Sequence, residues 1–137
     1  MAPLNEVSGT GSPGSVLVEF ITSATSEPFS TPSGVRWLVY MPSGFTGPTL
    51  TVKPTPDTSS NAAAKTAAVD VGDGESAGET DLVFTPAAGA AFCATVSSKA
   101  LRLAAISNAV LVSDASEDLQ ESNSAAADKA VRIEFRE

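Results

Sequence analysis

The sequence predicts an all-β protein, an antiparallel β-sandwich of the jelly-roll type with about eight short strands. Apolar and polar residues alternate with a period of two in several short segments. Glycine and proline interrupt these segments roughly every dozen residues, as turns between strands do. Amphipathic helical segments that could link parallel strands are missing from the pattern. We expect a single sandwich domain over residues 16–137, preceded by a flexible N-terminal arm over residues 1–15.

The arm is expected because Gly9, Gly11, Gly14, Pro3 and Pro13 stand among small polar residues. The alternating segments that follow predict strands over 15–22, 35–41, 49–53, 66–71, 81–85, 91–96 and 130–135. The strand over 35–41 is the most regular of these, and its alternation puts Trp37 on the apolar face and Tyr40 on the opposite face.

Four other segments have patterns without clear alternation. Residues 23–34 and 55–65 are polar or rich in proline and alanine, and we expect loops there. Residues 100–106 suit a helical turn and a buried strand equally well, and the following NAVLV favours strands. Residues 114–129 suit a short helix or a mobile loop. A loop is favoured, because Leu119 alone could dock a helix there.

Composition excludes several classes of function. The chain has 8 basic and 16 acidic residues, giving a net charge of −8. Such a balance argues against binding nucleic acid or anionic membranes, both of which attract basic surfaces. The chain contains no histidine, the commonest general base and transition-metal ligand. We expect a protein without a cofactor. We also expect it to be made in a cytoplasm, because the N-terminus lacks the features of a secretory signal.

The sequence offers two candidate sites besides its aromatic residues. The acidic segment 70–81 offers Asp70, Asp73, Glu75, Glu79 and Asp81, and we expect a solvated turn, with a weak calcium site as the alternative. Cys93, the single cysteine, is expected to be a small buried apolar residue, because the sequence shows no activating base. We therefore predict no catalytic, cofactor-binding or metal residue.

The aromatic residues Trp37 and Tyr40 could stack on a sugar. Their positions three apart in one strand put them on opposite faces, so they cannot form a single platform. We expect Trp37 in the core, and Tyr40 beside Leu38 at a contact between subunits, where tyrosine is enriched.

Residues 29–57, FSTPSGVRWLVYMPSGFTGPTLTVKPTPD, contain a Pro-Gly turn before a strand, a Met-Pro-x-x-Phe-Thr turn and a Leu-Thr strand. This segment resembles part of the small auxiliary, head decoration-type proteins of tailed bacteriophages. The matching positions are Phe29, Pro32, Gly34, Met41, Pro42, Phe45, Thr46, Leu50, Thr51 and Asp57. Where that family often has Asp-Gly, this chain has Asp57-Thr58.

The resemblance implies a β-sandwich that decorates or completes a capsid, neck or tail. We expect a non-enzymatic structural protein of the virion and favour a capsid decoration protein that binds the shell through its arm and one sandwich face. Its expected partners are the major capsid protein or other virion proteins, and further copies of itself in a homo-oligomer. A carbohydrate- or surface-binding β-sandwich module is the alternative, and it requires a cluster of exposed aromatic residues on one face.

Overall fold

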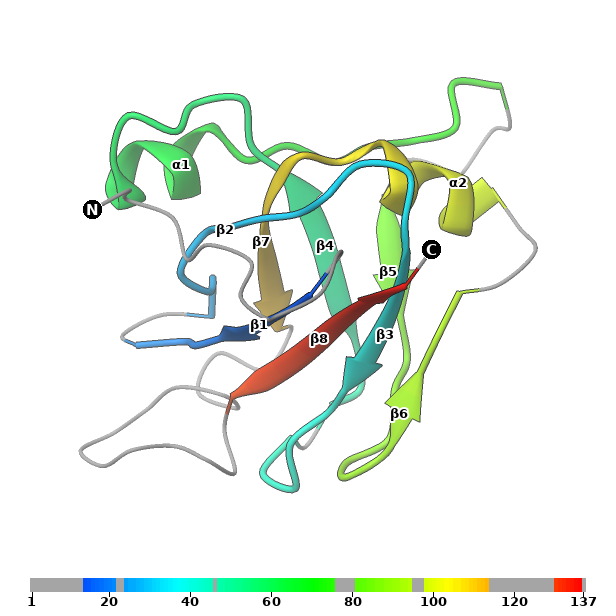
Figure 1. The fold of residues 1–137 in the computed structure, drawn as a ribbon. Helices are drawn as coiled ribbons and strands as arrows, with labels where there is room; N and C mark the ends of the chain where they lie inside the picture. Colours follow the sequence, from blue (N-terminus) through cyan, green and yellow to red (C-terminus); the bar gives the residue numbers. More distant parts are fainter. Residues whose placement is uncertain are drawn as a thin grey trace.

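A computed structural model describes residues 14–21, 24–45, 47–75, 81–94, 98–113 and 130–136. Within these residues the chain forms two antiparallel sheets of four strands each (Figure 1). The first sheet contains, in spatial order, β1 (Ser15–Val18), β8 (Val131–Arg136), β3 (Arg36–Tyr40) and β6 (Ala91–Phe92). The second contains β2 (Phe29–Ser30), β7 (Asn108–Ser113), β4 (Leu50–Pro54) and β5 (Leu82–Phe84). The predicted antiparallel β-sandwich is confirmed.

The strand order is that of a jelly roll. Strands far apart in the sequence pair in nested fashion: β1 with β8, β2 with β7, β3 with β6 and β4 with β5. Two further pairings, β3 with β8 and β4 with β7, join these four pairs into two sheets. The result is the double-sheet, eight-stranded arrangement expected for this class of fold.

The core lies between the sheets, where the inward-facing residues of both sheets meet. Trp37 of β3 is 1% exposed and lies near its centre. Its ring makes edge-to-face contacts with Phe29 of the opposite sheet and with Phe135 of β8, at centroid distances of 5.9 and 5.7 Å. The predicted core position of Trp37 is therefore confirmed.

Two helices complete the described structure. Helix α1 (Asn61–Ala67) lies against β7. Val110 faces away from the core side of β7, and it is nevertheless fully buried, as is Ala64 of α1. Helix α2 (Ser98–Ala105) contacts β3, and the amide of Gly34 donates to the carbonyl of Ala104 at 2.8 Å. Gly34 has φ +76°, a conformation that favours glycine, in the turn that leads into β3. Neither helix is long and apolar enough to cross a membrane.

The strand favoured over residues 100–106 is wrong, because helix α2 occupies this segment. A strand would put Leu101 and Leu103 on the same face. In the helix they point apart, so that Leu103 is 2% exposed in the core and Leu101 is 75% exposed. The short apolar segment was compatible with both structures, and its tertiary contacts favour the helix.

The loop predicted over 55–65 holds for residues 55–60 and is wrong from Asn61, where α1 begins. The strand predicted over 66–71 is wrong, since α1 extends to Ala67 and residues 68–71 form no strand. The alanines of α1 have high helix propensity. Ser60 caps the helix, because its hydroxyl accepts a hydrogen bond from the amide of Ala63 at 3.0 Å.

Other predictions differ from the structure mainly in where the strands begin and end. Strand β2 was not predicted and lies in the expected loop 23–34, whereas β7 confirms the strand favoured after residue 107. Strand β6 covers only the first two residues of the segment predicted over 91–96. Strand β1 begins at Ser15, within the predicted arm. Residues 1–13 of the arm and the whole of segment 114–129 lie outside the described residues.

Candidate functional site

The outward side of the first sheet is the candidate functional site. In β1, β8 and β3 the residues that face away from the core alternate with buried ones. We call this surface the arginine face, and it comprises Ser15, Leu17, Arg36, Leu38, Tyr40, Arg132, Glu134 and Arg136. It contains three of the eight basic residues of an acidic chain.

The strand register arranges the arginine face in three rows. The first row runs from Leu17 through Arg132 to Tyr40, and the second from Ser15 through Glu134 to Leu38. The third row pairs Arg36 directly with Arg136. Residues opposite each other on one face of such a sheet have Cβ atoms about 5 Å apart, so their side chains are neighbours.

Glu134 lies between two of the arginines on the same strand. Its carboxylate pairs with Arg132 at 2.9 Å and with Arg136, which donates to the other oxygen. The glutamate side chain is 16% exposed, whereas the two arginine side chains are 58 and 59% exposed. Glu134 therefore holds the two guanidinium groups in place and leaves much of each group open to solvent.

Apolar side chains of the arginine face are open to solvent as well. Leu17 is 51% exposed and Tyr40 is 38% exposed. The second sheet differs, because α1 lies against β7 and Val110 is buried beneath it. Exposed apolar residues beside arginine and tyrosine are the composition typical of protein interfaces.

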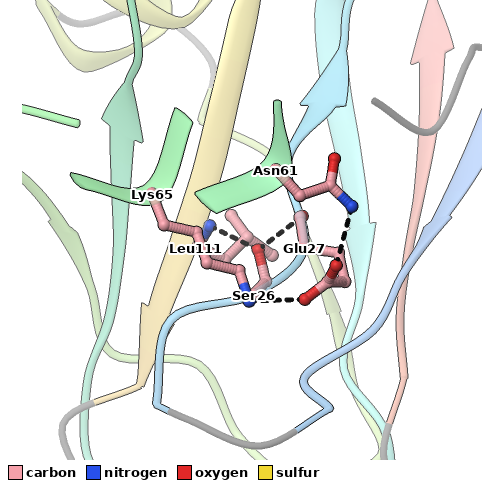
Figure 2. Close-up of polar contacts among 5 residues, drawn as sticks. All are labelled: Ser26, Glu27, Asn61, Lys65 and Leu111. Carbon is pink, nitrogen blue, oxygen red and sulfur yellow. Dashed lines mark hydrogen bonds and ion pairs between the residues drawn. The ribbon is translucent and has the colours of Figure 1, made fainter. Parts of the chain in front are cut away.

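A polar cluster fixes the segment before β2 to the second sheet (Figure 2). The amide of Ser26 donates to the carbonyl of Leu111 at 2.8 Å, and its hydroxyl accepts from the amide of Leu111 at 2.8 Å. The same hydroxyl donates to the carbonyl of Glu27 at 3.0 Å. Ser26 is fully buried, so these bonds satisfy a polar group that would otherwise be costly to bury.

Glu27 connects this segment to α1. Its carboxylate accepts from the side-chain amide of Asn61 at 3.0 Å and from the Lys65 ammonium at 2.5 Å (Figure 2). Its amide donates to the carbonyl of Glu19, which follows β1. The cluster thus ties together the two sheets and the helix, and we assign it a structural role.

A concave region lies beside the C-terminal end of α2 and has a volume of about 450 Å³. Its walls include Pro54, Val69, Val71 and Ile106. The guanidinium of the buried Arg102 also lines it and donates to the carbonyls of Val71 and Asp81, at 2.7 and 3.3 Å. Arg102 therefore ties α2 to two places in the chain before β5, at Val71 and at Asp81.

The structure separates the acidic residues of segment 70–81. Asp70 pairs with Lys53 at 3.5 Å, and Asp73 accepts from the amide of Glu75 at 2.9 Å in a local turn. Glu79 lies outside the described residues. Within the described part of this segment and the rest of the described chain, no three acidic or cysteine side chains come together as a metal site would require.

Cys93 is exposed, so the predicted burial of this thiol is wrong. The alternation itself was predicted correctly, because Phe92 and Ala94 pack against the core. Cys93 lies between them just after β6, and its side chain is therefore on the outward side.

The remaining candidate residues fall on opposite sides of β3, as predicted. Trp37 is buried and cannot stack on a sugar, whereas Tyr40 is exposed on the arginine face. Alternation predicted that Arg36, Tyr40, Arg132 and Glu134 point outward. It did not predict that they are neighbours, since their proximity follows from the pairing of β3 with β8.

Comparisons with family models, with curated proteins and with solved structures find no match to this chain.

Proposed function

We propose that this chain is a non-enzymatic structural protein of a tailed phage or phage-like particle. In this proposal it is a capsid decoration protein that binds the shell through its N-terminal arm and the arginine face. The observation that supports it best is the arginine face itself, with Leu17 and Tyr40 exposed beside arginines on one side of the sandwich. Such a surface suits attachment to another protein.

The fold and the resemblance support the proposal in different ways. Double-sheet jelly rolls occur in viral capsid domains and also in lectins, so the fold is compatible with the role without selecting it. The resemblance of residues 29–57 to decoration-type proteins is what favours a phage particle. The resembling segment includes β3, which contributes Arg36, Leu38 and Tyr40 to the arginine face.

The test is sedimentation of the native protein in lysate from its source, followed by peptide mass spectrometry of each fraction. We expect it to travel with particles of megadalton mass. If it stays near its own mass of 13.8 kDa, the proposed function is wrong.

Matched variants test whether the arginine face makes the attachment. We expect Leu17→Ser combined with Tyr40→Ser to reduce the amount bound to particles. Leu101→Ser removes an exposed leucine from α2, on another surface, and should leave binding unchanged. An equal loss in both variants would exclude the arginine face as the attachment surface.

A further inference from the structure

The charge of the arginine face is opposite to that of the chain as a whole. Its strand positions hold three arginines and one glutamate, a net charge of +2. The remaining five basic and fifteen acidic residues give the rest of the chain a net charge of −10. Glu19 follows β1 at the edge of this sheet, and the face remains net positive even when Glu19 is counted with it.

The arginines stand close together and remain accessible. Arg36 and Arg136 are direct cross-strand partners, and Arg132 and Arg136 both pair with Glu134 while their side chains stay 58 and 59% exposed. Their planar guanidinium groups have donors enough for a further carboxylate. A carboxylate of another protein placed over this row would accept hydrogen bonds from both β3 and β8.

From this charge and geometry we infer that the arginine face binds a carboxylate-rich protein surface. The inference rests on the proposed function and gives the chemistry of its partner: an acidic patch on the particle. Arg36, Arg132 and Arg136 contact carboxylates in this complex, and Leu17 and Tyr40 pack against apolar residues between them. Glu134 keeps two of the arginines oriented before binding.

Two other partners carry chemistry that the face must be tested against. Two copies of this chain related by a two-fold axis through the face would bring arginine rows toward each other, so this partner fits less well. Phosphate and sulfate polymers are polyanions like poly-L-glutamate, and the net charge of −10 on the rest of the chain repels both kinds of polymer. The comparison with heparin below therefore decides between them.

The test compares two double variants with the same change in net charge. Arg36→Gln with Arg136→Gln removes two positive charges from the face, and Lys53→Gln with Lys99→Gln removes two from β4 and α2. Binding to immobilised poly-L-glutamate is measured at about 50 mM and about 500 mM NaCl, which screens exposed charges. Thermal unfolding of both variants confirms that they are folded.

We expect the arginine double variant to bind poly-L-glutamate about tenfold more weakly at low salt, as the loss of two exposed ion pairs predicts. The lysine double variant should bind within about twofold of the native protein, and high salt should remove the difference. Equal loss in both variants, or no binding by the native protein, would overturn the inference. Tighter binding to heparin than to poly-L-glutamate would also overturn it and assign the face to phosphate- or sulfate-bearing polymers.

Two further measurements separate this inference from the proposed function. If the native protein and the arginine double variant sediment with particles equally well, the acidic partner is wrong and the attachment role stands. If the native protein does not sediment with particles, the proposed function fails whatever poly-L-glutamate shows. Self-association in analytical ultracentrifugation that the arginine substitutions abolish would assign the face to a second copy, and would overturn the inference.

Discussion

Asp57 shows how a local hydrogen bond changes the titration of one residue. Its carboxylate accepts from the Ser59 hydroxyl at 2.7 Å and from the Ser59 amide at 3.0 Å. These bonds favour the ionised form and lower the pKa of Asp57 below its ordinary value of 3.8, the hydroxyl having the larger effect. Because the pKa is lower in the folded chain, ionised Asp57 stabilises the folded state above pH 3.8. This stabilisation of the folded state is lost as the pH falls through the folded pKa.

We therefore expect Ser59→Ala to raise the pKa of Asp57 toward its ordinary value. The measurement is an NMR titration of the Asp57 carboxyl carbon. Ser43→Ala, at an exposed turn before β4, is the control and should leave this pKa unchanged. An unchanged Asp57 pKa in the Ser59 variant would show that the hydroxyl does not bind the carboxylate.

Trp37 combines close packing with a buried polar atom. Its indole nitrogen is buried, and the described residues provide no hydrogen-bond partner for it. We expect Trp37→Ala to lower the free energy of unfolding by about 3–5 kcal/mol, because it leaves a large cavity between Phe29 and Phe135. Trp37→Phe should cost about 1–2 kcal/mol, since it keeps a ring there and removes the unpaired donor. Urea denaturation followed by circular dichroism measures both, and equal losses would contradict the account.

At the scale of elements, α1 depends on contacts that are distant in sequence. Lys65 and Asn61 bind Glu27, and this pairing attaches the helix to the segment before β2. We expect Lys65→Met to lower the free energy of unfolding by about 1 kcal/mol, because the ion pair is half-buried and one partner remains. The free energy of opening that hydrogen exchange measures for the α1 amides should fall by a similar amount.

The control for this change is Lys53→Met. Lys53 pairs with Asp70 at 3.5 Å in a more exposed position, so its loss should have a smaller effect. If both substitutions leave the exchange of α1 unchanged, Glu27 does not hold the helix.

Elements were predictable from the sequence where one face is buried and the other is open. Alternation predicted β3 and β8 well, since inward residues such as Trp37 and Ile133 fall on every second position. It failed at α2, where LRLAAI is too short for its period to distinguish a helix from a strand. It also failed at β2, because a two-residue strand has no period and forms only through its pairing with β7.

At the scale of the whole molecule, the pairing of strands was not predictable. Which strands lie side by side depends on contacts between residues far apart in the sequence, such as Arg36 with Arg136. Local propensity contains no information on such contacts. The outward residues of the arginine face could therefore be predicted individually, and their assembly into rows could not.

The last prediction concerns the N-terminal arm as part of the whole chain. The carbonyl of Gly14 accepts from the amide of Phe135 at 2.9 Å, and β1 then adds Val16 and Val18 to the core. We expect deletion of residues 1–13 to shift the melting temperature by less than about 4 °C, which corresponds to about 1 kcal/mol in a chain of this size. Calorimetry of the truncated protein measures this shift.

Deletion of residues 1–18 is the matched control. It removes β1 from the edge of the first sheet and uncovers β8, so we expect loss of cooperative unfolding. Under the proposed function the shorter deletion should still weaken binding to particles, because the arm is one of the two attachment elements. A protein lacking residues 1–13 that saturates its particle with native affinity would exclude the arm from attachment and leave the arginine face as the remaining element.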